Sequence, residues 1–317
     1  MKKLFALLVL LVLGISYAQD CDAGFRSFEH AAGTDCIPEN PQRIVALQDQ
    51  NVLLPLMELG VTPLGASGAT NADGEGIFRR LDGYDTSDVV FLGNHREEDI
   101  ELVASLEPDL IITTPSPDWH YETFSLIAPT IVIDMFNQPV QVALFQFADA
   151  VNRTAEAEAL EARFNARVSE LLEPLGSIPE ETTGFVVLNN GAFRALPWVQ
   201  GFGAAFEAIG FSRSAWEEEN VTGIGVVEFS LEALGNVETD VIFLIDFTGD
   251  DGPDGQYEQF IANELVQLTP VGQANQIYQI DGTSMGGTSW LRSLDGVEQI
   301  AELLSDPNLD TSLVDEN

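Results

Sequence analysis

Residues 139–174 read PVQVALFQFADAVNRTAEAEALEARFNARVSELLEP, and between the two terminal prolines this stretch contains neither glycine nor proline. Apolar side chains recur in it at close to the helical period of about 3.6 residues: Val140, Leu144, Phe147, Val151, Ala155, Ala159, Phe164, Val168 and Leu171. One unbroken helix of this length would extend for about 50 Å. Such a helix must contact more than one structural unit. We therefore predict a backbone helix over residues 137–174 that joins two lobes.

Short apolar runs alternate with helical segments on both sides of this helix. The strands predicted before it are Arg43–Leu47, Val89–Leu92, Asp109–Thr113 and Thr130–Asp134, and those after it are Gly184–Asn189 and Asp240–Phe247. Helices are predicted near Asp99–Leu106, Gly203–Ile209 and Ser293–Leu304. This alternation is typical of the α/β class with parallel sheets. We expect an N-terminal lobe over residues 43–136 and a C-terminal lobe over residues 182–305.

An internal repeat suggests that the two lobes are duplicates. The segments 99–112 and 230–243 share one frame at an offset of 131 positions. In that frame Glu101 matches Glu232, Glu107 matches Glu238, Asp109 matches Asp240 and Ile111 matches Ile242. The helix ends at Leu59-Gly60-Val61 and Ile209-Gly210-Phe211 are also alike. Similar elements in the same order on either side of a long helix support a duplication.

The N-terminus has the order of a secretory signal: two lysines, an apolar run over residues 4–15, and small residues up to Ala18. We predict a signal peptide over residues 1–18, export, and a soluble mature chain without stable membrane insertion. Cys21 and Cys36 follow in a leader over residues 19–42. In an oxidising compartment we expect them to form a disulfide, with a metal-binding pair as the weaker alternative. Gln19 and Asp20 disfavour lipid attachment at Cys21.

The chain is strongly acidic, with 51 acidic and 13 basic residues and a net charge of −38. A polyanion of this strength repels phosphate backbones, so nucleic acid is excluded as a partner. Anionic membrane surfaces are disfavoured for the same reason. We expect the last residues, 306–317, to form a flexible acidic tail.

The chain resembles the solute-binding proteins of ABC importers, in the class with two lobes joined by one backbone helix that serves ferric siderophores, haem and cobalamin. The resemblance covers about residues 41–305 and rests on PQRIVAL (41–47), LGVTPLG (59–65), residues 99–112 and FSLEAL (229–234). It implies a monomeric periplasmic or extracytoplasmic protein that captures a small-molecule iron chelate and delivers it to the importer's permease. Neither a catalytic residue nor a cofactor is implied, and the siderophore itself would hold the iron. Glu101 and Glu232 are the residues expected to dock each lobe on the permease.

Ligands of open α/β sheets bind beyond the carboxyl ends of the parallel strands. On that basis we predict ligand contacts from loop residues of both lobes: Arg79, Arg80, His95, Arg96, Trp119 and Tyr121 in the first, and Arg194, Trp198, Trp216, Trp290 and Arg292 in the second. Ferric siderophores are often anionic, and the guanidinium fork suits carboxylate and catecholate oxygens. The alternatives are that the arginines only neutralise nearby acids and that each tryptophan belongs to the core.

Other functions remain open at this stage. Haem or cobalamin would fit the same fold. A free metal ion could be bound by His95 and His120, although few histidines are present. The segment Gly282-Thr283-Ser284-Met285-Gly286 fits the nucleophile pattern of serine hydrolases, but no histidine follows it to complete the triad. We therefore predict a binding protein and not an enzyme.

Overall fold

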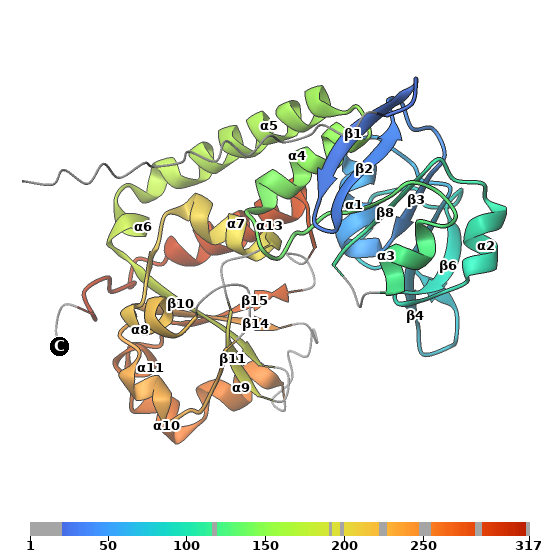
Figure 1. Cartoon of the computed structure of the whole chain (residues 1–317). Coiled ribbons are helices and arrows are strands. Elements are labelled where there is room, and N and C mark those ends of the chain that lie inside the picture. Colours follow the sequence, from blue (N-terminus) through green and yellow to red (C-terminus); the bar gives the residue numbers. More distant parts are fainter. Residues whose placement is uncertain are drawn as a thin grey trace, which may run out of the picture.

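The computed structural model describes residues 21–115, 119–189, 192–196, 200–221, 227–246, 255–282 and 287–314. Two α/β lobes lie side by side, and helix α5 (Thr154–Leu172) runs across one side of both (Figure 1). The predicted signal peptide, Trp198 and Ser284 lie outside the described residues. Within the described ranges, no helix is both long enough and apolar enough to cross a membrane.

The N-terminal lobe is built on a sheet with the strand order β7-β6-β4-β3-β8-β9, with β5 paired to β4. Its strands are β3 (Ile44–Leu47), β4 (Gly65–Thr70), β5 (Gly76–Ile77), β6 (Val90–Asn94), β7 (Glu97–Glu98), β8 (Leu110–Thr113) and β9 (Thr130–Val132). Its helices are η1 (Asp49–Leu53), α1 (Leu54–Glu58), α2 (Ile100–Ser105) and α3 (Trp119–Phe124). The central strands β3 and β8 are parallel and buried at every position. Their unbroken apolar sequences reflect a sheet covered on both faces.

The C-terminal lobe repeats this plan with the strand order β13-β11-β10-β14-β15 and with β12 beside β10. Its strands are β10 (Thr183–Asn189), β11 (Phe193–Ala195), β12 (Ser212–Arg213), β13 (Val227–Phe229), β14 (Val241–Asp246) and β15 (Ile277–Asp281). The helices are η2 (Glu173–Leu175), α6 (Ile178–Glu181), α7 (Gln200–Ile209), α8 (Ala215–Asn220), η3 (Ala233–Asn236), α9 (Gln256–Ile261), α10 (Glu264–Gln267), α11 (Pro270–Gln273) and α13 (Trp290–Leu304). Strands β10, β14 and β15 are parallel, whereas β11 and β13 are antiparallel additions, as are β5 and β7 in the first lobe. The predicted α/β class with two lobes is confirmed, and each sheet is mixed with a parallel centre.

The matched aspartates of the internal repeat make the same contact in both lobes. Asp109 precedes β8, and its Oδ2 accepts a hydrogen bond of 2.7 Å from the backbone amide of Gln42. Asp240 precedes β14, and its Oδ2 accepts one of 2.7 Å from the amide of Thr183. Each carboxylate thus joins the start of one central strand to the start of its neighbour. The repeated sequence therefore encodes a repeated structural contact.

The turns that follow helices α1 and α7 are also alike. Gly60 follows α1 with φ +73°, and Gly210 follows α7 with φ +88°. A side chain is strained at such angles, so glycine is favoured just beyond a helix end. The next strand, β4 or β12, then pairs in parallel with the first strand of its lobe.

The prediction of one unbroken helix over residues 137–174 is wrong. The chain forms α4 (Val140–Ala150) and α5, separated by a turn. Asn152 has φ +57° in that turn, a left-handed conformation that asparagine tolerates better than most residues. The absence of glycine and proline therefore did not guarantee a continuous helix. In Figure 1, α4 lies beside α5 instead of extending it.

Helix α5 nevertheless contacts the cores of both lobes, as the two-lobe interpretation requires. Ala157, near its start, packs into the core of the N-terminal lobe. Phe164 and Val168, farther along, pack into the core of the C-terminal lobe. Leu160 lies between them and contacts both cores. Helix α4 also contacts both cores, through Phe147 in the N-terminal lobe and Leu144 in the C-terminal lobe, so α4 and α5 together connect the lobes.

The leader forms a hairpin of β1 (Phe25–His30) and β2 (Gly33–Pro38) that packs on the N-terminal lobe. The predicted disulfide between Cys21 and Cys36 is confirmed. Phe28 and Ile37 are buried in the lobe's core, so the hairpin belongs to the lobe and is not a loose leader.

The expectation of a flexible tail after residue 305 is wrong as far as Val314. The side-chain amide of Gln276 donates to the carbonyl of Asp310 over 2.9 Å. The backbone amide of Val314 donates to Asp240 Oδ1 over 3.1 Å. An acidic composition alone predicted disorder here, whereas specific hydrogen bonds hold this segment on the lobe.

Candidate functional site

The carboxyl ends of the two central sheets meet at the junction of the lobes. The amide of Thr288, in the segment between β15 and α13, donates to the carbonyl of Gln50, just beyond β3, over 3.2 Å. Thr288 Oγ1 also donates to Asn51 Oδ1 over 3.0 Å. A Cβ on Gly287 would lie 2.7 Å from the Gln50 carbonyl oxygen, so glycine is required for this approach. The junction is thus the place where ligands of open α/β sheets are held.

Arg79 is fixed at this junction by a buried carboxylate. Asp49 lies in η1, a π-helical turn of a kind often found at functional sites, and is fully buried. Its oxygens accept hydrogen bonds from the Arg79 backbone amide, Nε and Nη2 over 2.9, 2.9 and 2.8 Å. The pKa of Arg79 is raised chiefly by this hydrogen bonding. Asp49 therefore neutralises Arg79, as the alternative interpretation held.

Arg80 and Arg292 meet across the lobes. Arg80 has φ +61°, a strained angle for a side-chain-bearing residue, and donates to Gln50 Oε1. Its carbonyl accepts a hydrogen bond of 2.9 Å from Arg292 Nη2. Burial, followed by the charge of Arg79, lowers the pKa of Arg80. Two guanidinium groups held close together in a chain of net charge −38 favour an anionic ligand nearby.

Arg292 pairs with two carboxylates. Asp295, one turn along α13, accepts from Arg292 Nη1 over 3.2 Å. Asp82 lies 3.7 Å from Arg292 Nη2, and its side chain is 95% exposed. The Asp82 carboxylate is the exposed partner, so this pair contributes little free energy and can be exchanged for a ligand oxygen.

His95 and His120 come together around Glu98 at the same edge of the N-terminal sheet. His120 Nε2 lies 2.8 Å from Glu98 Oε2, and His95 Nδ1 lies 3.6 Å from Glu98 Oε1. Burial acts to raise the pKa of Glu98, but hydrogen bonds with His120 and His95 outweigh it and hold this pKa well below its usual range. The residues that the structure describes include no group of three ligating side chains placed to hold a metal. The cluster therefore gives no support to the free-metal alternative.

Replacing Glu98 with glutamine is expected to lower the free energy of unfolding by about 2 kcal/mol at neutral pH, because charge-assisted hydrogen bonds become neutral ones. Because folding lowers the pKa of Glu98, its ionised carboxylate stabilises the folded chain at pH values above the pKa of the unfolded chain. This contribution is lost as pH falls below that pKa. The difference between wild type and Glu98→Gln should therefore shrink below about pH 4.5. Urea titrations of both proteins from pH 3 to pH 7 measure it. A constant difference over that range would contradict the assignment.

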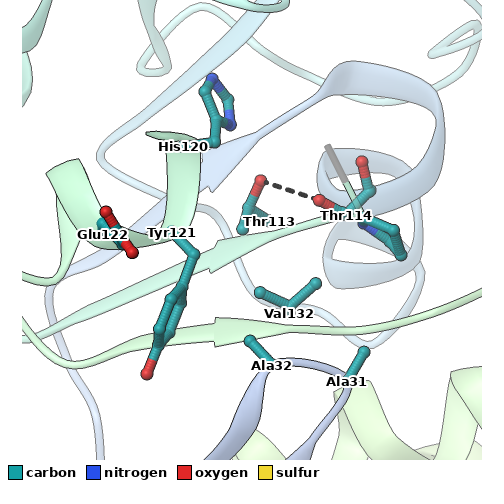
Figure 2. A pocket seen from close by; sticks show the side chains of 9 residues that line it. Ala31, Ala32, Thr113, Thr114, His120, Tyr121, Glu122 and Val132 are labelled. Carbon is teal, nitrogen blue, oxygen red and sulfur yellow. Dashed lines mark hydrogen bonds between the residues drawn. The ribbon is translucent and has the colours of Figure 1, made fainter. Parts of the chain in front are cut away.

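A pocket of about 370 Å³ opens beside this cluster (Figure 2). Three elements line it: the turn of the β1–β2 hairpin, the ends of β8 and β9, and the start of α3. The lining residues are Ala31, Ala32, Thr113, Thr114, Pro115, His120, Tyr121, Glu122 and Val132. Tyr121, a predicted ligand contact, lines the pocket and donates its hydroxyl proton to Asp35 Oδ2.

Two of the predicted tryptophan contacts pack in or against the core: Trp290 is buried, and Trp216 is partly buried. Trp290 is 2% exposed, and its ring centroid lies 5.2 Å from that of Phe164 on α5. Trp216 packs edge to face on Phe185 and Phe229, in a different core cluster of the C-terminal lobe from that of Trp290. Aromatic residues bury large areas, so their presence near predicted loops did not identify a ligand surface. We remove both from the candidate site.

Three predicted contacts remain: Arg96, Arg194 and Trp119. Arg96 is exposed, has φ +75°, and donates its backbone amide to Glu98 Oε1 over 3.1 Å. Arg194 lies on β11 with its Nη2 3.7 Å from Glu228 Oε2. Trp119 begins α3, and its side chain lies outside what the structure describes.

Three carboxylates that shape the site were missed from the sequence: Asp49, Glu58 and Glu98. Asp49 could have been suspected, because it directly follows a buried parallel strand. Glu98 lies three positions after His95, which is a weak signal. Glu58 carried no signal, because its partners lie more than 230 positions away in the sequence.

The family model described as periplasmic binding protein matches residues 45–283. The chain belongs to the periplasmic binding protein family. This family consists of binding proteins and not enzymes, which sets the hydrolase alternative aside. The matched range begins after the β1–β2 hairpin.

Curated relatives of this periplasmic binding protein match it over most of its length. It is 25% identical over 311 residues to the probable siderophore-binding lipoprotein YfiY of Bacillus subtilis (strain 168), covering 90% of this chain and 94% of that protein. It is 26% identical over 297 residues to the ferric enterobactin-binding periplasmic protein FepB of Escherichia coli O6:H1, covering 86% and 88%. Among solved structures, Staphylococcus aureus SirA complexed with staphyloferrin B has a TM-score of 0.71 at 20% identity, covering 90% and 99%. That likeness confirms the two-lobe fold.

Proposed function

We propose that the protein captures an anionic ferric siderophore outside the cytoplasm and delivers it to the permease of an ABC importer. The observation that carries the proposal is the meeting of Arg80 and Arg292 at the junction where both sheets present their carboxyl ends. Relatives over nearly the whole chain support it, because their names refer to siderophore binding or ferric enterobactin. Capture and release require no covalent chemistry.

The guanidinium groups suit the outer oxygens of an iron chelate. A guanidinium presents parallel N–H donors that match carboxylate or catecholate oxygens, and it stays charged at any physiological pH. Arg79 is held by Asp49, and Arg80 and Arg292, which meet where the lobes join, are the cations that we assign to the ligand. Iron would stay in the chelate, because Glu98 is already engaged by His120 and by the Arg96 amide.

The two arginines are tested by ligand titration of single variants. Arg80→Ala and Arg292→Ala are each expected to weaken binding of ferric enterobactin and ferric citrate about tenfold or more, since each removes a hydrogen bond to a charged group. Quenching of intrinsic tryptophan fluorescence measures the affinity, and haem and cobalamin are titrated in parallel. Arg153→Ala is the control, because Arg153 pairs with Glu156 on the exposed side of α5.

Two results would count against the proposal. Failure of the wild-type protein to bind any ferric chelate would refute the siderophore function, and tight binding of haem or cobalamin alone would replace it. Unchanged affinity in both arginine variants, with normal melting curves, would move the anion site away from the lobe junction.

A further inference from the structure

The β1–β2 hairpin lies outside the range that the family model matches, yet its turn forms a wall of the pocket in Figure 2. Ala31 and Ala32, at the tip of the hairpin, face the pocket together with Val132 of β9 and Tyr121 of α3. The Ala31 amide donates to the Val132 carbonyl over 2.9 Å. The hairpin tip is therefore joined directly to the sheet that supports the pocket.

A buried histidine fixes the inner side of this wall. The His30 side chain is fully buried. Its Nδ1 accepts hydrogen bonds of 3.3 Å from the backbone amides of Ala32 and Val132, so that nitrogen carries no proton. The proton is assigned to Nε2, which lies 2.9 Å from Asp35 Oδ2 and donates to it. His30 thus joins one hairpin residue and one sheet residue that both line the pocket.

Asp35 extends the connection to the other side of the pocket. The same oxygen, Oδ2, accepts a hydrogen bond from the Tyr121 hydroxyl, and the rings of His30 and Tyr121 lie 5.6 Å apart. Asp35 directly precedes Cys36, whose disulfide with Cys21 closes the hairpin. The position of the Tyr121 ring is therefore set by a hairpin residue and not by α3 alone.

We propose that the hairpin supplies one wall of a ligand subsite and that Asp35 is a positioning residue that holds the Tyr121 ring in it; the inference rests on the proposed siderophore function. Among the described lining residues there is no lysine or arginine. Alanine, proline, valine and tyrosine side chains give the pocket apolar surface beside the polar Thr113, Thr114 and His120, and Glu122 repels carboxylates. The subsite therefore takes a flat aromatic arm of the chelate in preference to a carboxylate arm, while Arg80 and Arg292 take the charged oxygens.

A double-mutant cycle tests the role of Asp35. Asp35→Ala, Tyr121→Phe and the double variant are titrated calorimetrically with two probes, iron(III) 2,3-dihydroxybenzoate and ferric citrate. Each single variant is expected to bind the aromatic probe about tenfold more weakly, and the double variant no more weakly than Asp35→Ala, because both changes remove the hydrogen bond between Tyr121 and Asp35. Ferric citrate should bind all three variants within about threefold of wild type. Asp35→Asn keeps an acceptor oxygen and should restore most of the affinity.

Asp149→Ala is the matched control. It removes the carboxylate that pairs with Arg26 over 3.2 Å, a second contact that holds the hairpin on the protein without lining this pocket. It should leave both affinities unchanged. Equal weakening of both probes by Asp35→Ala, or additive losses in the double variant, would overturn the inference and leave the proposed function standing. A wild-type protein that binds ferric citrate but not the aromatic probe would also overturn the inference and leave the proposed function standing. A wild-type protein that binds neither would refute both.

Discussion

Replacing Glu101 and Glu232 together with lysine is expected to abolish uptake of the iron chelate while leaving ligand affinity unchanged. Both side chains are exposed, and both stand at matched positions of the internal repeat, one in each lobe. Glu101 lies in the first turn of α2, and Glu232 directly precedes η3. Hydrogen bonds from its own backbone amide and from Ser230 lower the pKa of Glu232, so it stays ionised at physiological pH. We propose that both charges dock on a basic surface of the permease, in which case reversing them turns attraction into repulsion.

The internal repeat provides a control with the same change in net charge. Glu107 and Glu238 are also matched and exposed, so Glu107→Lys with Glu238→Lys should leave uptake intact. Uptake of the radioactive iron chelate is followed in cells that carry the permease, and affinity is measured on the purified proteins. Full transport by the Glu101 and Glu232 double variant, or equal loss in the control, would refute a docking role. A partial loss is expected in each single variant.

The fold was predictable from the sequence where a structural role imposes a pattern that repeats or a run of one residue type. The duplication was visible because Asp109 and Asp240 perform the same hydrogen bonding at the same point of each lobe. Buried parallel strands were visible because they must be apolar on both faces. The break at Asn152 was not visible, because asparagine is compatible with both a helix interior and a left-handed turn. The apolar residues keep the helical period across Asn152, although the chain changes direction there between α4 and α5.

The site was predictable only in outline. Of the predicted contacts, Arg79, Arg80 and Arg292 do lie together at the lobe junction, and their contact with a ligand stays a prediction. Which of these guanidinium groups is already bound by a carboxylate of the protein depends on partners remote in the sequence. Asp49, for example, lies 30 positions from Arg79. The sequence also could not separate a tryptophan of the core from one of the site, because Trp290 begins a helix at the junction yet points inward. Pairings of this kind are decided by tertiary structure.

The second large effect concerns Glu58, which joins the lobes through the N-terminus of α13. Its Oε1 accepts hydrogen bonds from Ser289 Oγ over 2.7 Å and from the Leu291 amide over 2.8 Å. Its Oε2 accepts one of 3.1 Å from the Trp290 amide. A carboxylate here satisfies amides that the helix itself leaves unpaired and lies at the positive end of the helix dipole. Since Glu58 ends α1 in the first lobe, this contact fixes α13 of the second lobe against it.

Glu58→Ala is expected to lower the free energy of unfolding by about 3 kcal/mol, because three donors at the lobe junction lose their acceptor at about 1 kcal/mol each. Urea titration followed by circular dichroism measures this loss. Glu58→Gln is the control, since it keeps one acceptor oxygen and the shape of the side chain and should lose less. Equal stability of wild type and Glu58→Ala would show that the hydrogen bonds contribute nothing to holding the lobes.

The pH dependence of the free energy of unfolding separates the effect of the Glu58 charge from the effect of its shape. Burial raises the pKa of Glu58 from 4.5 to about 7, against the opposing effect of hydrogen bonds from Ser289, Leu291 and Trp290 and of the Arg292 charge. The nearby Tyr84, whose pKa burial raises to about 12, stays neutral over this range. Because folding raises the pKa of Glu58, the protonated carboxyl is the form that the folded chain favours. Its contribution to the free energy of unfolding is fully present below about pH 4.5 and is lost as pH rises through about 7. The stability of wild type relative to Glu58→Gln should therefore fall between pH 4.5 and pH 7 and then level off. A rise over the same interval would mean that the ionised carboxylate is the form that folding favours.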